Sequence, residues 1–98
     1  MKAKVIILPA AAKYFKKLAD KSLKGKFLNA IERLSDNPYL GKAKTGDLKG
    51  IYSYDIYYNK TNYEMAYRIN INEDGTIIVI IMAGTRENFY KELKRHEK

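Results

Sequence analysis

The sequence contains no cysteine and only one histidine, His96, among its 98 residues. Without cysteine, the chain can form neither a disulfide framework nor a thiolate metal site. A single histidine excludes a histidine-rich metal cluster and a nuclease that works through two imidazoles. The sequence also lacks a phosphate-binding P-loop, a glycine-rich dinucleotide turn and a Gly-x-Ser-x-Gly elbow. We therefore expect neither a metal nor a cofactor.

A signal peptide or membrane segment is also not apparent near the start. The apolar run there, residues 5–8, is only four residues long. A signal sequence or a membrane-spanning helix needs a much longer run. We therefore expect a cytoplasmic protein that does not bind membranes.

Acidic residues are in the minority. The chain has 19 lysines and arginines against 11 aspartates and glutamates, which gives a formal charge of +8. A soluble surface alone explains a net charge of about 2–8 in a small domain, and this value lies at the upper edge. The excess favours a polyanionic or acidic partner. The length leaves room for one domain only, which we take to span residues 1–98.

Periodicity in the first part of the chain predicts a strand followed by two helices. Residues 3–8 form a β-branched run typical of a strand, and Pro9 suits the first position of a helix. Apolar residues then recur at helical spacing, at Ala11, Tyr14, Phe15 and Leu18. A second helix is expected to begin with Ser22 as its cap and to end before Pro38. Two helices so close in sequence should form an antiparallel hairpin.

The rest of the chain predicts three strands and a final helix. After a loop at residues 38–50, strands are expected at residues 52–59, 63–72 and 77–82. Alternation in the second strand puts Glu64 and Arg68 on one face. Thr85 should cap the last helix, with Glu87 in its first turn. The fold class is therefore α+β in the order β-α-α-β-β-β-α, an antiparallel sheet with a helical hairpin on one face and a short C-terminal helix.

An arginine and a tyrosine stand where the last strand gives way to the last helix. Arg86 offers a permanent cation with a donor fork suited to phosphate, and Tyr90 can stack on a base or move a proton. The alternative for Arg86 is a surface pairing with Glu87. Phe89 and Leu93 are spaced to pack on the sheet, which would leave Tyr90 turned toward a groove. In a small basic protein, this pair suggests RNA.

The sequence carries three motifs in order: Leu-Lys-Gly at residues 48–50, Asn-Tyr-Glu-Met-Ala-Tyr-Arg-Ile at 62–69, and Gly-Thr-Arg-Glu-Asn-Phe-Tyr at 84–90. With the element order, they resemble the RelE/ParE superfamily of bacterial toxins, the toxic halves of type II toxin–antitoxin operons. The resemblance covers essentially the whole chain. It implies one of two targets: RelE-type members cleave mRNA in the ribosomal A site, in contact with rRNA, and ParE-type members poison DNA gyrase. It also implies a cognate antitoxin that wraps the toxin with an acidic or amphipathic segment.

The central strand departs from the family pattern. RelE-type members usually read Tyr-Arg-x-x-Tyr there, with the arginine on the phosphate. Tyr63 and Tyr67 match the two tyrosines, but Glu64 occupies the place of the arginine. Two positions of the preceding strand that carry lysines in RelE fall on Asp55 and Tyr57. If the protein cleaves mRNA, we expect Glu64 either to pair with a nearby cation, for which the candidates are Arg68, Lys49 and Lys60, or to face away from the scissile phosphate.

The candidate catalytic residues are Arg86, Tyr90 and Arg68. The first two match the C-terminal arginine and tyrosine of the family. Arg68 follows Glu64 by four residues, roughly 13 Å at strand rise, and could replace the missing arginine. The alternative for Arg68 is a cross-strand ion pair, with Asp55 as the possible partner. The candidate RNA-binding residues are Lys44, Lys49 and Lys60 in loops and Tyr57 on the sheet.

Two function classes compete. One is a ribosome-dependent, metal-independent endoribonuclease, in which the 2′-hydroxyl of the substrate attacks the adjacent phosphorus. The protein then has to orient the backbone, stabilise the oxyanion and assist proton transfer. The other is a non-enzymatic gyrase inhibitor or a toxin that has lost its activity. Arg86 and Tyr90 favour the first class, which we predict, and Glu64 favours the second.

Overall fold

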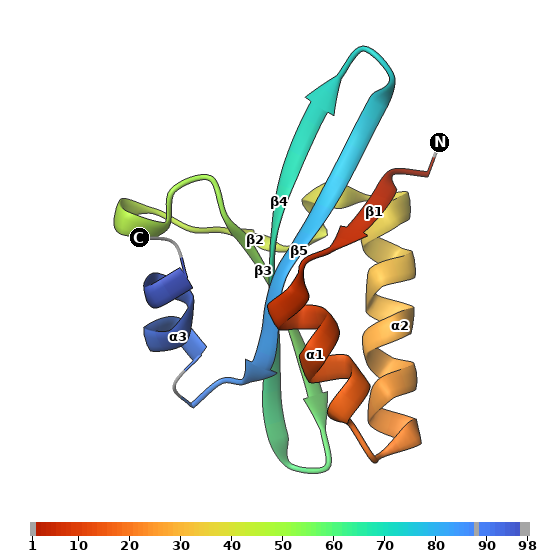
Figure 1. Ribbon diagram of the computed structural model, residues 1–98, viewed down its shortest axis with the longest axis vertical. Helices are drawn as coiled ribbons and strands as arrows, with labels where there is room; N and C mark the ends of the chain where they lie inside the picture. Colours follow the sequence, from red (N-terminus) through yellow and green to blue (C-terminus); the bar gives the residue numbers. More distant parts are fainter. Residues whose placement is uncertain (1, 88, 97–98) are drawn as a thin grey trace.

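The computed structural model describes residues 2–87 and 89–96, and its elements follow the predicted order with one extra strand (Figure 1). The strands are β1 (Lys4–Ile7), β2 (Lys42–Ala43), β3 (Tyr52–Tyr58), β4 (Thr61–Asn72) and β5 (Gly75–Thr85). The helices are α1 (Pro9–Lys17), α2 (Lys21–Asp36) and α3 (Phe89–His96), with 3₁₀ turns η1 (Pro38–Leu40) and η2 (Gly46–Leu48). The predicted α+β class is confirmed. Within the described residues, no helix is both long enough and apolar enough to cross a membrane.

The strands form one sheet in the order β1-β5-β4-β3-β2. Strands β3 to β5 pair antiparallel as expected, and β2 pairs antiparallel with β3. Strand β1 lies parallel to β5, so the sheet is mixed. The prediction of an antiparallel sheet is wrong in this one pairing. Parallel neighbours need a long connection, and here almost the whole chain lies between them. The predicted loop at residues 38–50 also contains β2, which pairs with the start of β3.

The helical hairpin of α1 and α2 covers one face of the sheet and encloses the main core (Figure 1). The rings of Phe15 in α1 and Phe27 in α2 lie 5.3 Å apart. Phe27 also meets Tyr63 of β4 edge to face, with ring centres 5.9 Å apart. The sheet contributes mainly Ile56, Met65, Tyr67, Ile78 and Ile80. Each apolar side chain buried in this way stabilises the fold by about 1.5–3 kcal/mol.

The start of α2 differs from the prediction. Asp20 caps this helix instead of Ser22, because Asp20 Oδ1 accepts hydrogen bonds from the N–H groups of Ser22 at 2.9 Å and Leu23 at 3.1 Å. Aspartate and serine are equally good caps, so residue type alone did not decide between them. The same oxygen also accepts a hydrogen bond from the Tyr58 hydroxyl at 3.2 Å, which ties α2 to β3.

The start of α3 also differs from the prediction. Thr85 is the last residue of β5 and not a cap, and α3 begins at Phe89. The N–H of Phe89 donates to the carbonyl oxygen of Arg86 at 3.2 Å. Glu87 therefore precedes the helix, and Glu92 is the acidic residue of its first turn. The strand runs further than predicted because β4 continues to pair with it as far as Thr85.

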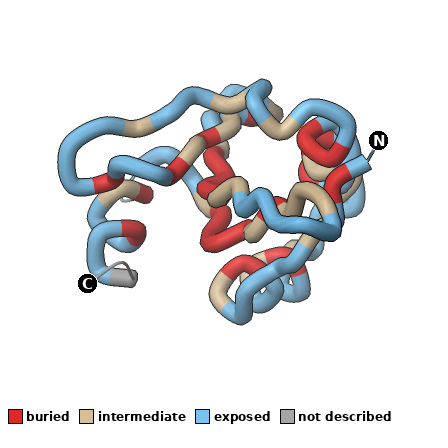
Figure 2. The backbone as a smooth tube through the Cα atoms, turned by 90° about the horizontal axis from the view of Figure 1, so that it is seen from above, coloured by how far each residue is buried: buried red, intermediate tan, exposed pale blue. Residues whose placement is uncertain are grey.

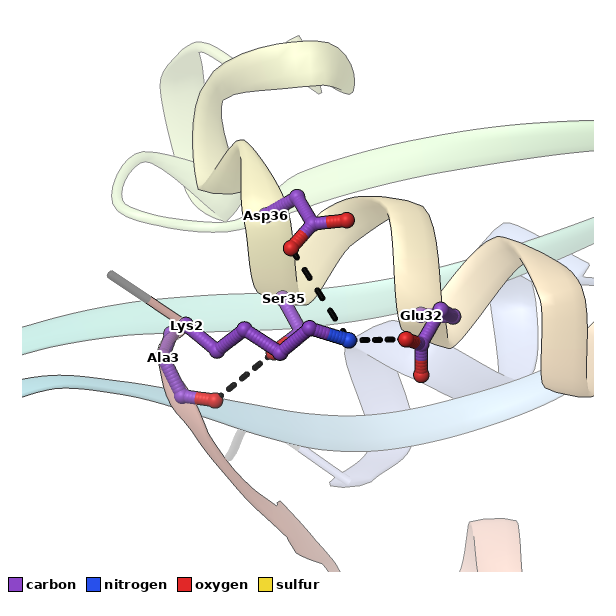
Figure 3. A network of polar contacts seen from close by, with 5 residues as sticks. All are labelled: Lys2, Ala3, Glu32, Ser35 and Asp36. Carbon is purple, nitrogen blue, oxygen red and sulfur yellow. Dashed lines mark hydrogen bonds and ion pairs between the residues drawn. The ribbon is translucent and has the colours of Figure 1, made fainter.

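Polar contacts tie the start of β1 to the end of α2 (Figure 3). The Ser35 hydroxyl donates to the carbonyl oxygen of Ala3 at 2.8 Å, and the Ala3 N–H donates to the carbonyl oxygen of Ser35 at 2.8 Å. Lys2 Nζ pairs with Glu32 and lies 3.9 Å from Asp36. The Ser35 contacts satisfy buried polar groups, whereas the exposed lysine contacts stabilise the fold little.

The opposite face of the sheet carries a second, smaller core beneath α3. Phe89 and Leu93 are buried there, as their spacing predicted. They pack against Leu48, Ile51, Ala66, Ile81 and Met82. Figure 2 shows the buried residues gathered at the centre of the molecule, with exposed residues along the outer sides of helices and loops.

A β-bulge between β4 and β5 supports this second core. Ala66 pairs with Met82 and Tyr67 pairs with Ile80, so Ile81 is the extra residue. Ile81 and Met82 consequently both join the core beneath α3, while Ile80 joins the main core. The bulge lets one strand supply two successive apolar side chains to the last helix.

Candidate functional site

Arg86 is the first residue after β5, and its backbone is held on both sides. Its N–H donates to the carbonyl oxygen of Asn62 in β4 at 2.9 Å, and its carbonyl oxygen accepts from the Phe89 N–H. The side chain is nevertheless 59% exposed. The fold therefore sets where this side chain leaves the sheet and keeps much of it accessible to solvent.

Glu64 of β4 is the buried partner of this arginine. The side chain is 1% exposed, and its Oε1 lies 3.3 Å from Arg86 Nε. Its Oε2 has no hydrogen-bond partner in the part of the chain that the structure describes. Burial is the main reason why the pKa of Glu64 is raised, since it disfavours the charged form. The Tyr90 hydroxyl, Lys44 and Arg86 lower the pKa, and Asp55, directly opposite in β3, raises it further.

Tyr90 meets Lys44 between α3 and the segment that follows β2. Lys44 Nζ donates to the Tyr90 hydroxyl oxygen at 2.6 Å, and the same nitrogen lies 4.6 Å from the centre of the ring. Tyr90 is half-buried, while Phe89 and Leu93 of the same helix are in the core. The predicted division of the aromatic residues of this helix is confirmed. A lysine that donates to the tyrosine oxygen leaves the tyrosine proton available to another acceptor.

The structure thus brings Arg86, Tyr90 and Lys44 together around the carboxylate of Glu64. Arg86 presents a planar donor fork, Lys44 an ammonium group and Tyr90 a hydroxyl group, which are the groups that a phosphate binds. Two cations face two carboxylates, those of Glu64 and Asp55, so the cluster is formally neutral before a ligand binds. The roles predicted for these residues stay predictions.

Arg68 lies at another part of the sheet. A Cβ atom built on Gly50 would lie 3.1 Å from Arg68 Nη1, so the guanidinium lies against the turn that contains Lys49 and Gly50. Asp55 pairs across the strands with Glu64. The predicted ion pair of Arg68 stays a prediction. The structure groups Arg68 with Lys49 and does not bring it to Arg86.

The remaining RNA-binding candidates lie nearer to Arg86. Lys60 is exposed in the turn between β3 and β4, where its φ angle is 62°. Tyr57 is 64% exposed and pairs with Asn62, the residue whose carbonyl oxygen binds the Arg86 N–H. Tyr57 and Lys60 therefore lie at the Arg86 end of β3, and Lys49 lies at the other end.

A cleft of about 300 Å³ opens between α1, the end of β5 and α3. Its lining includes Tyr14 and Phe89, and its acidic groups are Glu87 and Glu92. None of the predicted site residues lines it. The lining of the cleft holds these two carboxylates and no lysine or arginine, which disfavours a phosphate there, whereas Arg86, Tyr90 and Lys44 meet at the cluster around Glu64.

A family model described as the ParE-like toxin of type II bacterial toxin–antitoxin systems matches residues 5–94. The chain belongs to this toxin family. The predicted membership in the RelE/ParE superfamily is thereby confirmed. No curated protein sequence matches the chain.

Solved structures of other toxins share the fold of this toxin. A mutant of the E. coli toxin RelE in the free state superposes with a TM-score of 0.70 at 15% identity, over 97% of this chain and 98% of its own. The YoeB/ParE toxin from Agrobacterium tumefaciens gives a TM-score of 0.71 at 16% identity, over 85% and 98%. The toxin–antitoxin complex RelBE2 from Mycobacterium tuberculosis gives 0.68 at 24% identity, over 88% and 100%. At such identities the likeness supports the RelE-like fold alone.

Tyr67, which the resemblance matches to the second tyrosine of the family motif, is a core residue in this toxin. Its hydroxyl donates to the carbonyl oxygen of Pro38 at 2.7 Å and accepts from the Gly41 N–H at 3.0 Å. Burial raises the pKa of Tyr67 to about 12. Gly41 approaches so closely that a Cβ atom there would lie 2.5 Å from the Tyr67 hydroxyl. Tyr67 therefore fixes the segment around η1 to the sheet.

The ion pair between Glu64 and Arg86 was not predicted from the sequence. The predicted partners, Arg68, Lys49 and Lys60, are wrong, because the cation at Glu64 is Arg86. The hairpin turn between β4 and β5 held the signal. Counting back from that turn along both strands brings Ala83 opposite Glu64, one residue from the observed partner Gly84 because of the bulge at Ile81, and so places Arg86 close to Glu64. No comparable signal in the sequence indicated that the Glu64 carboxylate is buried, because its face of β4 carries few apolar residues.

Proposed function

We propose that this toxin cleaves mRNA on the ribosome. The observation that carries the proposal is the grouping of Arg86, Tyr90 and Lys44 around one point at the end of β5. Such a grouping of two cations and a hydroxyl suits a phosphodiester whose charge increases during cleavage. The formal charge of +8 supports a polyanionic substrate.

In the proposed reaction, the substrate supplies its own nucleophile. The 2′-hydroxyl oxygen attacks the adjacent phosphorus, the bond from phosphorus to the 5′-oxygen breaks, and a 2′,3′-cyclic phosphate forms. The proton of the 2′-hydroxyl must be taken up, and the 5′-oxygen must receive a proton. In this scheme Arg86 stabilises the phosphorane oxygens, and Tyr90, held by Lys44, takes part in the proton transfer.

The cationic and aromatic side chains along β3 would hold the RNA backbone. Tyr57 and Lys60 flank the Arg86 end, and Lys49 and Arg68 lie at the other end, about 20 Å away along the strand. Exposed lysines bind phosphates regardless of sequence, whereas an exposed tyrosine can stack on a base. This arrangement would align a single strand across the open face of β3.

Cleavage of mRNA on programmed ribosomes, mapped by primer extension, tests the proposal. The purified toxin should cut ribosome-bound mRNA, and the Arg86→Ala variant should not. Arg95→Ala is a matched control, because Arg95 is also exposed and its ion pair is with Glu92 of α3, at 3.4 Å. Absence of cleavage by the unmodified toxin would overturn the proposal.

A second candidate function is inhibition of DNA gyrase without catalysis. Two observations favour it: the matching family model is the ParE-like one, and Asp55 and Glu64 face each other where RelE-type toxins carry cations. A supercoiling assay with purified gyrase tests this candidate. Inhibition of supercoiling together with intact mRNA on ribosomes would favour gyrase as the target.

We also propose that an antitoxin binds this toxin. Among the structures with the same fold, RelBE2 and the intact E. coli RelBE are described as toxin–antitoxin complexes. The strong positive charge of the chain favours a partner segment with acidic residues. The open face of β3, where Tyr57 is 64% exposed, gives such a segment room to lie across the cluster.

A further inference from the structure

The contact between Glu64 and Arg86 joins a buried carboxylate in the sheet to a largely exposed side chain. Glu64 lies in β4, which is paired on both sides, with Asp55 of β3 and Gly84 of β5 as its direct neighbours. A carboxylate that is 1% exposed in such a strand cannot follow a moving partner. Arg86, in contrast, has a long side chain that is more than half exposed.

The contact also uses one particular nitrogen of the guanidinium. Arg86 Nε lies 3.3 Å from Glu64 Oε1. The planar guanidinium has donors on more than one edge, so an ion pair made through Nε leaves terminal N–H groups for a second anion. With the backbone of Arg86 fixed by Asn62 and Phe89, the side chain is held at both ends.

We propose that Glu64 is a positioning residue, which holds Arg86 through Nε so that its terminal nitrogens are set in advance for a phosphate group of RNA. The proposal rests on the proposed function, since it names the device that prepares Arg86 for that substrate. It also gives a reason for a glutamate where RelE-type toxins carry an arginine. The cation comes from the end of β5, and the central strand supplies the anchor that orients it.

The burial of Glu64 argues against a purely structural role. One of its oxygens has no hydrogen-bond partner among the described residues, and its main ion-pair partner is largely exposed. Replacing a buried ionic group by an apolar one of similar size is often neutral or stabilising. An apolar residue of similar size would therefore stabilise the fold at least as well as Glu64 does. We infer that the carboxylate acts through Arg86 instead.

The competing interpretation is that Glu64 only repels the phosphate. The two interpretations predict opposite signs for the same substitution. If Glu64 positions Arg86, Glu64→Met should lower kcat/KM on ribosome-bound mRNA by about 100-fold, because small misplacements of a catalytic group have effects of this size. If Glu64 only repels RNA, the same variant should cleave faster.

Two further variants make the comparison specific. Glu64→Gln keeps an oxygen acceptor for Nε and should retain much more activity than Glu64→Met, although its neutral hydrogen bond is weaker. Asp47→Asn is the matched control and should leave cleavage unchanged, because Asp47 is an exposed carboxylate outside the cluster, 3.8 Å from Lys94. Thermal unfolding of each variant should show midpoints equal to or above that of the unmodified toxin, which separates the effect from misfolding.

A measurement without substrate tests the positioning itself. In a ¹⁵N NMR spectrum of the unmodified toxin, the Arg86 Nε–H should give a separate signal that is protected from exchange with water. The signal should persist in Glu64→Gln and move to the position of freely exposed arginines in Glu64→Met. This readout does not depend on mRNA cleavage, so it decides the positioning role even if the proposed function fails. An unchanged Nε–H signal in Glu64→Met, or faster cleavage by that variant, would overturn the proposal.

Discussion

Lys44 Nζ and the hydroxyl oxygen of Tyr90 lie 2.6 Å apart, and this contact joins the segment after β2 to the last helix. The two residues are far apart in the sequence, but Leu48 packs with Phe89 and Leu93 in the same small core. The core places the helix, and the lysine then holds the tyrosine that projects from it. A satisfied polar pair at the rim of an apolar core thus fixes the position of the tyrosine hydroxyl group.

We predict that Lys44→Ala lowers cleavage while the fold stays intact. Loss of the ammonium group frees the Tyr90 hydroxyl and removes one cation from the phosphate site, so a decrease of about 10–100-fold in kcat/KM is expected. Cleavage on programmed ribosomes measures it. Lys42→Ala is the matched control, because Lys42 is an exposed lysine two residues earlier in β2. Equal losses in both variants would show that only the total charge matters.

Arg86→Ala is expected to abolish toxicity. The variant also leaves the buried Glu64 without its ion-pair partner, so the free energy of unfolding should fall by about 1 kcal/mol. Growth of cells that express the variant measures the first effect, and urea unfolding measures the second. The double variant Arg86→Ala/Glu64→Gln should recover the stability without recovering the toxicity. Growth arrest by either variant would remove Arg86 from the site.

Tyr67→Phe should reduce stability rather than activity. The substitution removes the hydroxyl that pairs with the carbonyl oxygen of Pro38 and the N–H of Gly41, and the loss should be about 1–3 kcal/mol. Urea unfolding measures it. Tyr57→Phe is the control, since its side chain is 64% exposed and its loss of a hydroxyl should change stability by at most about 0.5 kcal/mol. Similar losses in both variants would contradict a special role for Tyr67.

The sequence predicted most of the fold because the local signals agree with the tertiary structure. The helical stripe of Ala11 and Phe15 and the alternation of β4 both face the main core as expected. The parallel pairing of β1 with β5 could not be predicted, because no local signal gives the direction of a strand whose partner is distant in sequence. The bulge at Ile81 was hidden for a similar reason, since residues 77–82 are apolar at every position.

The site was predictable where a residue's role depends on its own element. The spacing of Phe89 and Leu93 sufficed to turn Tyr90 away from the core. Lys44 meets Tyr90 through a contact between distant segments, so this pair needed the tertiary structure. Glu64 and Arg86 belong to one hairpin, and only the bulge at Ile81 shifts their register. Glu64 stands where RelE-type toxins carry an arginine, which suggested that the activity is lost. In the structure, Glu64 is instead the ion-pair partner of Arg86.

An acidic antitoxin segment should raise the thermal stability of this toxin. Binding to the folded state alone stabilises it, by about 2.7 kcal/mol when the free ligand is at 100 times its dissociation constant. Thermal unfolding with and without a synthetic peptide of the cognate antitoxin measures the shift. The effect should weaken in Arg86→Ala if the peptide crosses the cluster. An unchanged thermal shift in Arg86→Ala would mean that the peptide contacts only the lysines of α1 and α2. That result would contradict a binding mode in which the peptide crosses the cluster.

The raised pKa of Glu64 should make stability depend on pH in a defined direction. In the unfolded chain this carboxyl group should titrate near its ordinary pKa of 4.5, while burial raises the pKa in the folded protein. Between those two values the folded state binds more protons, so the free energy of unfolding should fall as the pH rises through this interval. Urea unfolding of the unmodified toxin from pH 4 to pH 8 measures the decline, although other groups also contribute to it.

Glu64→Gln isolates the contribution of this one carboxyl group. The variant resembles the protonated form, so its stability relative to the unmodified toxin should increase as the pH rises above about 4.5 and level off above the folded pKa. Asp55→Asn serves as the control, because Asp55 is exposed and faces Glu64 across the strands. Removing Asp55 should lower the pKa of Glu64 and therefore reduce the decline without abolishing it. A difference between Glu64→Gln and the unmodified toxin that stays constant with pH would mean that the folded protein does not raise the pKa of Glu64.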